Sequence, residues 1–472
     1  MAQSARRWRN AAVVMAAAGL LSLGLGTPGA SAAEEPRIDL KVLVVDNGDS
    51  PVEAVTEELK TTGIPYTTVD LNDSDRPAIT EAFLSDTVNG TPRARYQGVV
   101  LPNEGPFGAG CLGCLDGPLA FEDNSSSVQE SYGYVARPRA GFTSHVDTAV
   151  PGGSGRRSLV GEYAHDGRRE LVVVTFAHNH YQQQFRVLAR GVVEWLTQGV
   201  HLGQNRNYFS VHVDDVFAPD SRWDTERNCT PGDFDCVGDD GERTTPIRMT
   251  AADAVYAAQW QRDSGFTLDM VYNAGAGEER KSENGDGSTR YVSRADISTE
   301  ISANNLWAAS HRLPVDTSEL VTGFESYILP QEARTALGHA VGNDPRPHYV
   351  HRSNLAEDRL LHPVLDKVLA DHRALYADNA LLENPRQSAV GTELKRRAAW
   401  QEAVAGGDVT AYRVGTTVTA PSGTQIPVTA PEGTLKQLLL GTTAFGTPYA
   451  GERSAWTTPD ALQTALTLRL PA

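Results

Sequence analysis

The sequence predicts an α/β protein of several domains that ends in a small all-β unit. Three observations support this fold class. From residue 34 to about residue 203, apolar strand-like runs alternate with helical patterns, which is typical of a parallel sheet. A second strand–helix–strand pattern begins near Tyr208. After residue 405 the pattern changes to short alternating runs between Gly, Pro, Ser and Thr turns, which indicates a β-sandwich-like module.

The amino-terminal segment has the pattern of a secretory signal peptide. Arg6, Arg7 and Arg9 precede an apolar run, and the small residues Ala30-Ser31-Ala32 follow it. We therefore expect a secreted, extracellular protein in which residues 1–33 lie outside the fold. The 472 residues are too many for one ordinary domain. The expected units are 34–203, 204–405 and 406–472.

The composition is that of a soluble, core-forming protein, with 40% hydrophobic and 21% charged residues. The formal net charge of −17 disfavours binding to nucleic acid. Beyond the signal peptide, no apolar stretch approaches the length that spans a membrane. A neutral or cationic glycan remains compatible with this charge.

The expected elements follow from apolar spacing. In the first unit the strands are expected at 41–45, 66–69, 98–101 and 171–176, and the helices at 51–61 and 181–197. In the second unit the strands are expected at 208–217 and 266–272, and the helices at 250–262, 297–310, 330–339, 354–376 and 391–404. Thr250 to Asp253 forms a capping-box-like start for its helix.

The four cysteines fall into two local pairs, Cys111 with Cys114 and Cys229 with Cys236. In an exported protein such pairs are expected to be disulfides. A redox Cys-x-x-Cys pair and a zinc site are the alternatives for Cys111 and Cys114.

Two adjacent acids, Asp214 and Asp215, end the apolar strand-like run that opens the second unit. Carboxylates at the end of a buried strand are costly unless a metal or a catalytic use compensates them. Because successive side chains of a strand point in different directions, one acid could bind a metal while the other acts as a base. The alternatives are a helix cap and a structural cation such as calcium.

Histidines supply the second candidate cluster. His348 and His351 flank a short strand-like run. His351 could act as a general acid, because the ordinary pKa of a histidine lies near neutrality. The alternative for His351 is a cap for the helix expected near Asn354. His311 ends a predicted helix, where it could interact with the helix dipole, and His339 and His362 are interpreted as structural.

Residues 210–217 (Ser-Val-His-Val-Asp-Asp-Val-Phe), residues 219–224 (Pro-Asp-Ser-Arg-Trp-Asp) and the Cys229–Cys236 loop resemble a known family. The segment from Tyr349 to Leu355 adds to this likeness. The sequence resembles the galactosaminogalactan deacetylases, a fungal enzyme and its bacterial relatives. The resemblance implies an N-terminal carbohydrate-binding module, a NodB-like deformed barrel of (β/α) units and a β-rich C-terminal domain.

The resemblance also implies roles. NodB-like enzymes use a T-x-D-D motif, so Asp214 would be the base and Asp215 a ligand of a divalent metal, which we expect to be zinc. His351 would protonate the leaving amine, and His311 is the candidate second ligand. The expected substrate contacts are Arg222, Trp223 and Asn354. The expected partner is an amino-sugar polysaccharide, bound by a monomer.

The chain departs from the family in one respect. It has no H-[ST]-x-x-H motif, and the segment from about Asn273 to Phe324 is short for such a barrel. Two hypotheses follow. The protein is a metal-dependent deacetylase of an N-acetylated, amino-sugar exopolysaccharide, or it is a catalytically inactive glycan-binding or cell-surface protein with the same modules.

Overall fold

The computed structural model of the chain describes most of the polypeptide. The described residues are 13–17, 35–102, 110–112, 132–134, 137–138, 140–150, 153–165, 167–173, 180, 182–214, 216, 220–222, 246–270, 282–283, 289–290, 324–407, 409–421, 425–460 and 462–471. Within these residues, no helix combines the length and the apolar character needed to cross a membrane.

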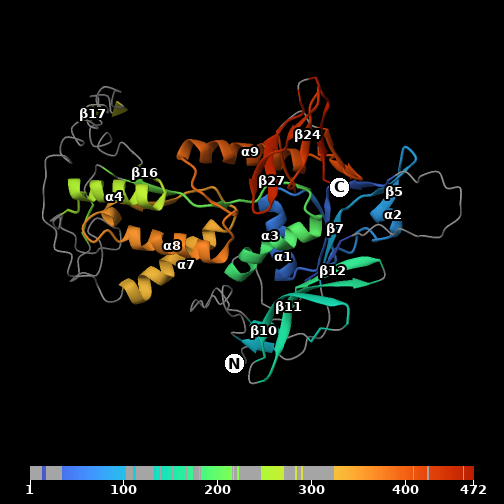
Figure 1. Cartoon of the computed structure of the whole chain (residues 1–472), viewed down its shortest axis with the longest axis horizontal. Helices are drawn as coiled ribbons and strands as arrows, with labels where there is room; N and C mark the ends of the chain where they lie inside the picture. Colours follow the sequence, from blue (N-terminus) through green and yellow to red (C-terminus); the bar gives the residue numbers. More distant parts are fainter. Residues whose placement is uncertain are drawn as a thin grey trace.

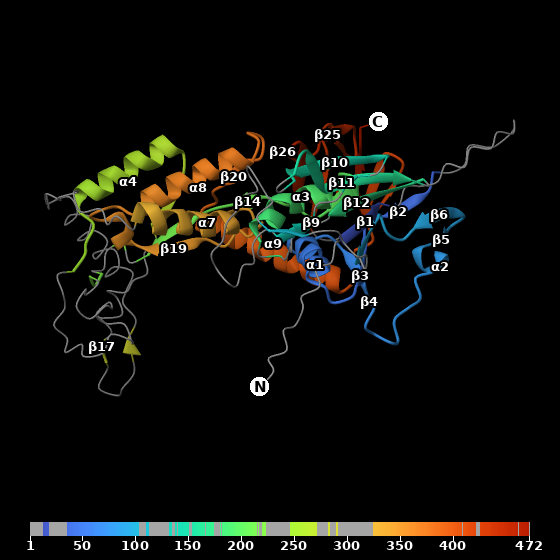
Figure 2. The same ribbon diagram turned by 90° about the horizontal axis from the view of Figure 1, so that it is seen from below.

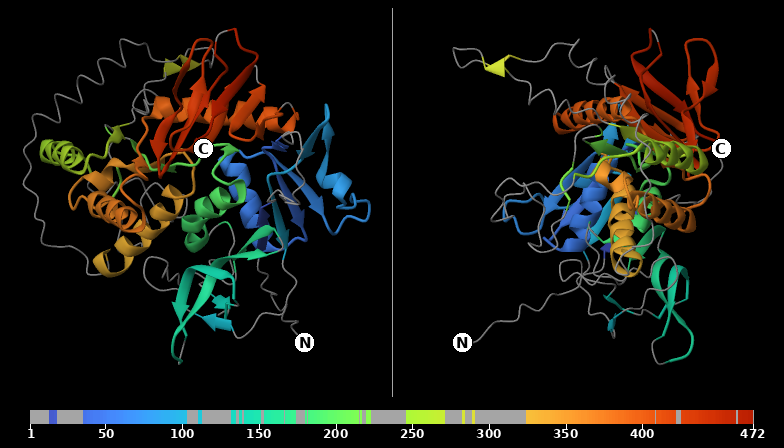
Figure 3. Two further views of the ribbon diagram at one scale, coloured as in Figure 1. Left: turned by 45° about the vertical axis from the view of Figure 1, so that its right-hand side comes forward. Right: turned by 90° about the vertical axis from the view of Figure 1, so that its left-hand side faces the viewer.

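A seven-stranded sheet forms the centre of the amino-terminal part (Figure 1). Its order is β10 (Phe142–Ala149), β11 (Arg156–His165), β12 (Arg168–Val173), β1 (Val13–Ala17), β7 (Gly98–Pro102), β3 (Val42–Asp46) and β4 (Tyr66–Asp70). As the alternating pattern predicts, β3 pairs in parallel with both β4 and β7. The hairpin strands β10 and β11 extend away from the C-terminal strands (Figure 3).

Two helices, α1 (Ser50–Thr62) and α3 (Gln183–Thr197), pack against this sheet. Val42 and Val44 of β3 face them, whereas Leu43 and Val45 face a second cluster that contains Tyr96. The alternation follows from the period of two in a strand. Because both faces are apolar, residues 42–45 of β3 are buried between these two clusters.

The strand β1 differs from expectation. Residues 1–33 are predicted to lie outside the fold, but Val13–Ala17 pair antiparallel with β12 on one side and with β7 on the other. The run Val-Val-Met-Ala-Ala is apolar enough to serve as an inner strand. Since β1 is antiparallel to both neighbours, β7 and β12 run parallel to each other. Removal of β1 would leave a gap in the sheet between these two parallel strands.

The carboxyl-terminal strands form two further sheets. The eight-stranded sheet has the order β25 (Thr442–Ala444), β24 (Leu435–Gln437), β28 (Ala465–Arg469), β22 (Thr417–Pro421), β21 (Tyr412–Val414), β2 (Arg37–Asp39), β6 (Thr91–Ala94) and β5 (Ser85–Val88). The short helix α2 (Glu81–Leu84) precedes β5. Strands from both ends of the sequence therefore share one sheet, through the pairing of β2 with β21.

The four-stranded sheet consists of β13 (His201–Leu202), β23 (Ile426–Pro431), β27 (Glu452–Thr457) and β26 (Thr447–Tyr449). One apolar cluster joins it to the eight-stranded sheet, with Val418 and Leu468 on one side and Val428 on the other. Trp400 of α9 (Gln387–Ala405) completes this cluster, and α9 lies beside these strands in Figure 1. The described residues after 405 are thus rich in strands, as the sequence predicts, but they share both sheets with strands from before residue 203.

The central part contains a parallel three-stranded sheet, β16 (Leu268–Met270), β15 (Val211–Asp214) and β19 (His348–His351), in that order. The helices α4 (Ala251–Ser264), α7 (Leu329–Ala340) and α8 (Leu361–Leu375) accompany it. A π-helical turn, η2 (Phe324–Ile328), directly precedes α7. In Figures 1 and 2, α4, α7 and α8 form a group separate from the C-terminal strands. The remaining described pairs are β14 (Asn207–Tyr208) with β20 (Leu382–Glu383), β8 (Gly110–Leu112) with β9 (Tyr132–Tyr134), and β17 (Ser282–Glu283) with β18 (Thr289–Arg290).

The start of α4 follows the predicted capping box. Thr250 Oγ1 accepts the N–H of Asp253, and the Asp253 carboxylate accepts the N–H of Thr250 at 2.9 Å. Asp253 is fully buried and also accepts a 2.8 Å hydrogen bond from Nε of Arg359. The cap therefore also fixes the segment that leads into α8.

The expected helix from residue 354 begins later than predicted. Residues Arg352–Leu355 form a 3₁₀ turn, η3, and α8 begins only at Leu361. Ala356 is extended, and Glu357 and Arg359 have positive φ values of 51° and 55°. These conformations interrupt a helix, although the apolar spacing continues through Leu355. The predicted helix at 297–310 lies outside the described residues.

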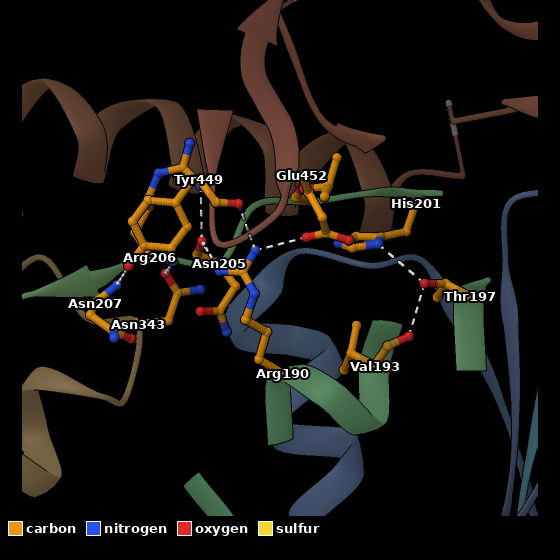
Figure 4. A network of polar contacts seen from close by, with 12 residues as sticks. Arg190, Val193, Thr197, His201, Asn205, Arg206, Asn207, Asn343, Tyr449 and Glu452 are labelled. Atoms are coloured by element: carbon orange, nitrogen blue, oxygen red, sulfur yellow. Dashed lines mark hydrogen bonds and ion pairs between the residues drawn. The ribbon is translucent and has the colours of Figure 1, made fainter. Parts of the chain in front are cut away.

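A polar network joins the three parts just before β15 (Figure 4). Arg190 of α3 donates to Glu452 of β27 at 2.7 Å, and its guanidinium lies over the ring of Tyr449 at 4.9 Å from the centroid. The Tyr449 hydroxyl accepts the N–H of Asn207 at 2.9 Å. Because these contacts hold the linker that runs into β14 and β15, they position the strand that carries Asp214.

Candidate active site

The candidate site lies at the carboxyl end of the parallel sheet β16–β15–β19. Asp214 ends β15, His351 ends β19, and their Cα atoms are register partners in the two adjacent strands. Paired side chains of neighbouring parallel strands point to the same side, about 4.8 Å apart. The structure thus brings together the two residues that the sequence predicts as base and acid. The carboxyl end of parallel strands is where α/β enzymes commonly hold catalytic groups.

Asp220 supports His351 from the loop that follows β15. Its Oδ1 lies 3.3 Å from Nδ1 of His351, and its Oδ2 accepts the N–H of Ser353 at 3.1 Å. The Asp220 side chain is 14% exposed, and Nε of the buried Arg352 lies 3.8 Å from it. A backbone bridge between Asp220 and Ile247 fixes this acid in place. Sequence reasoning placed Asp220 in the loop after the paired acids but missed its contact with His351.

An ion pair closes one side of the site. Arg222 donates to both carboxylate oxygens of Glu357, at 3.0 Å and 2.5 Å. Glu357 lies in the irregular segment between η3 and α8, so the pair connects the loop after β15 to that segment. The positive φ of Glu357 could not be predicted from the sequence, because glutamate is not typical of left-handed backbone. Asn354 lies within η3 and is half-buried.

A buried histidine lies beneath the site. His212 is 7% exposed, and its Nε2 lies 3.6 Å from the carboxylate of Asp269 in β16. Burial lowers the pKa of His212, and the charge of Asp269 opposes this effect. Asp269 also accepts a hydrogen bond from Arg386 and the N–H of Gln387, so it ties β16 to the start of α9. Neutral His212 therefore acts as part of the support for β15.

Several predicted residues lie outside the described part of the chain. These are Asp215, His311, Trp223, Cys114, Cys229 and Cys236; the backbone of Cys111 lies in β8, but its side chain is not described. Among the described residues, no group of three His, Cys, Asp or Glu side chains could hold a metal ion. Asp214, Asp220 and His351 alone therefore do not form a metal centre, and a metal would require ligands from the rest of the chain.

The arrangement can carry out acid–base chemistry. A carboxylate and an imidazole on adjacent strand ends can act on the two sides of one bond, the first by accepting a proton and the second by donating one. The carboxylate of Asp220 favours the tautomer of His351 that carries its proton on Nδ1. Nε2 of His351 is therefore the nitrogen suited to act on a substrate. Hydrolysis of an amide or ester requires both transfers.

Comparisons with known proteins give a fold likeness. The sequence matches no protein-family model and no curated protein. The structure is similar to the crystal structure of Agd3, described as a novel carbohydrate deacetylase, with a TM-score of 0.59. The likeness covers 93% of this chain and 99% of that chain at 11% sequence identity. The mixed α/β fold is thus shared with a carbohydrate deacetylase along nearly the whole chain.

Proposed function

We propose that the protein is a secreted deacetylase that removes N-acetyl groups from an amino-sugar polysaccharide. The observation that carries this proposal is the Asp214–His351 pair, with Asp220 on Nδ1 of His351, at the carboxyl end of a parallel sheet. The fold likeness to Agd3 supports the substrate class, because Agd3 is described as a carbohydrate deacetylase.

The proposed chemistry is amide hydrolysis. Asp214 accepts a proton as water attacks the acetyl carbonyl carbon. His351 Nε2 donates a proton to the amide nitrogen as the carbon–nitrogen bond breaks, so acetate and a free amine leave. Asp220 holds the imidazole in the donating orientation through its contact with Nδ1. The proton on Asp214 then passes to solvent, and His351 Nε2 takes up a proton from solvent, which restores the starting state of both residues.

Metal dependence is a separate part of the proposal. We propose that the protein binds a divalent ion, which we expect to be zinc, with Asp215 and His311 as its expected ligands. A bound zinc ion would supply polarisation of the acetyl carbonyl and of the attacking water. Metal analysis of the purified protein and of the Asp215→Ala variant tests this part. Retention of the metal by the variant would remove Asp215 from the ligand set.

The test of the activity is acetate release from N-acetylated amino-sugar oligomers, with zinc or cobalt present. Asp214→Asn should lower kcat by about 10²–10⁴-fold, because general-base catalysis contributes on that order. Asp371→Asn, in a partly exposed ion pair of α8, is the matched control and should retain wild-type kcat. Unchanged kcat in Asp214→Asn would refute the role of Asp214.

The second candidate is a glycan-binding protein without catalysis. Two observations favour it: the described residues contain no three-ligand group, and the sequence contains no H-[ST]-x-x-H motif. This candidate predicts that the wild-type protein binds amino-sugar oligomers but releases no acetate with any added metal. Export is tested by sequencing the amino terminus of protein recovered from the culture medium, which should begin near residue 34.

A further inference from the structure

A cavity of about 980 Å³ lies at the opposite end of β19 from His351. Its walls come from α1, α3, α9 and the segment between α7 and β19, so the amino-terminal and central parts of the chain both reach it. The volume is at the upper end of the range for small-ligand pockets, roughly 300–1,000 Å³. The cavity is therefore large enough for a sugar residue.

Tyr349 connects the cavity to the candidate active site. It lines the cavity, its side chain is 69% exposed, and its ring centroid lies 6.3 Å from that of His351. Tyr349 and His351 are two residues apart in one strand, so they project from the same face of β19. An exposed aromatic ring in this place offers an apolar face on which a sugar ring can stack. A glycan chain could thus run from the cavity over Tyr349 to His351.

The cavity wall carries an excess of positive charge. Its cationic residues are Lys60, Arg186, Arg346 and Arg397, and Asp344 is the carboxylate among the lining residues. Asp344 pairs with Arg346, with a shortest contact of 2.5 Å. Lys60 and Arg397 have acid partners in Glu57 and Glu393, but neither of these acids lines the cavity. This surface is unusual in a chain with a net charge of −17.

Two stacked histidines complete the wall without adding charge. The rings of His339 and His348 lie 4.9 Å apart between centroids. Burial lowers the pKa of His348 to about 4, and the neighbouring His339 contributes to this shift. Burial also lowers the pKa of His339, with a further contribution from Arg186. Both rings are therefore neutral near pH 7, and the charge of the wall comes from lysine and arginine.

Building on the proposed function, we propose that this cavity holds the sugar residue next to the one that reacts at His351. We propose further that its cationic wall selects a residue without a free ammonium group. An N-acetylated residue is uncharged, whereas the deacetylated product is cationic near neutral pH and meets like charge in the cavity. The enzyme would then act poorly beside a residue that has already lost its acetyl group, and free amines would be spaced along the polymer.

The test measures binding to the Asp214→Asn protein, in which turnover is expected to be slow. Two amino-sugar oligomers of equal length are compared by titration calorimetry, one fully N-acetylated and one partly deacetylated. At low salt the deacetylated oligomer should bind about tenfold more weakly, and the difference should shrink at about 0.5 M salt, because exposed charges are then screened. Equal binding of the two oligomers at low salt would overturn the inference.

Substitutions locate the effect in the cavity. Lys60→Gln combined with Arg346→Gln should remove most of the tenfold difference, while Lys367→Gln on α8 should leave it intact. Tyr349→Ala should weaken binding of both oligomers alike, and Tyr349→Phe should restore it because the ring is kept. Persistence of the full difference in the double variant would also overturn the inference.

The binding data separate this inference from the proposed function. If the wild-type protein releases no acetate but still prefers the acetylated oligomer, the proposed deacetylase activity fails and the charge selection stands. If it releases acetate equally well beside acetylated and deacetylated residues, the activity stands and the charge selection fails.

Discussion

The carboxylate of Asp220 lies 3.3 Å from Nδ1 of His351 and accepts the N–H of Ser353 at 3.1 Å. Asp220, from the loop after β15, therefore contacts both the end of β19 and the turn η3 that follows it. Its low exposure, 14%, preserves the strength of these contacts. Asp220 is thus a positioning residue for the candidate acid.

The first prediction concerns this contact. Asp220→Asn keeps the size of the side chain but removes its charge, so the contact that orients the imidazole of His351 is weakened. We expect kcat for acetate release to fall by about 10–100-fold, as for other groups that orient a catalytic side chain, with KM changed less than about threefold. A KM effect without a kcat effect would indicate that Asp220 binds substrate instead.

The second prediction separates two roles of Arg222, substrate contact and loop anchor. Its guanidinium pairs with both oxygens of Glu357, so Arg222→Glu and Glu357→Arg should each place like charges together and displace the loop after β15. Each should lower kcat/KM by about 5–20-fold, and the charge-swapped double variant should recover most of it. Failure of the double variant to recover would show that Arg222 itself contacts the substrate.

The third prediction concerns the contact between α3 and β27. The side chains of Arg190 and Glu452 are 17% and 13% exposed, so Arg190→Met leaves a poorly solvated carboxylate without its cation. The free energy of unfolding in urea should fall by about 2–4 kcal/mol. Lys367→Met breaks a more exposed pair with Asp371 and should cost less than about 1 kcal/mol. Equal losses in the two variants would contradict this account.

The fourth prediction concerns pH and Glu194. Burial raises the pKa of Glu194, and the adjacent Glu452 raises it further through a hydrogen bond and its charge. The folded state therefore keeps a proton that the unfolded state loses near pH 4.5, so the stability contributed by Glu194 falls as pH rises above that value. Glu194→Gln should match wild type in free energy of unfolding at pH 4 and exceed it by at least about 1 kcal/mol at pH 8.5.

A control checks that this effect belongs to the buried site. Glu402→Gln changes an exposed glutamate of α9 and should leave the pH dependence of Tm unchanged. A Glu194→Gln protein whose Tm follows the wild-type pH profile would show that Glu194 is not protonated in the fold.

Strand placement around the site could be predicted from local patterns. The apolar run before Asp214 and the run between the two histidines both form strands, β15 and β19, and the capping box of α4 lies where Thr250 and Asp253 indicate. These features depend on neighbouring residues alone, which is why periodicity and cap residues were enough. The family resemblance gave only the expected roles of Asp214 and His351 as base and acid, and their pairing on adjacent strands was not predicted.

Features that depend on distant residues could not be predicted in the same way. The cavity wall collects Lys60, Arg186, Arg346 and Arg397 from four separate segments, and no local pattern connects them. The late start of α8 depends on the backbone of Glu357 and Arg359, whose positive φ values are held by tertiary contacts with Arg222 and Asp253. Apolar spacing does not report such contacts.

The pairing of β2 with β21 has a consequence for the order of folding. Arg37–Asp39 pairs with β6 on one side, but its partner on the other side is Tyr412–Val414, so a chain made from its amino end must wait for almost its whole length before this sheet can close. Such long-range closure is slow, because the entropy of a large loop is lost before the strand contacts form. Until then β2, β6 and β5 present an open edge, and a fragment that stops before residue 412 would keep that edge permanently. Strands near the end of the sequence thus complete a sheet that β2, the second described strand, begins.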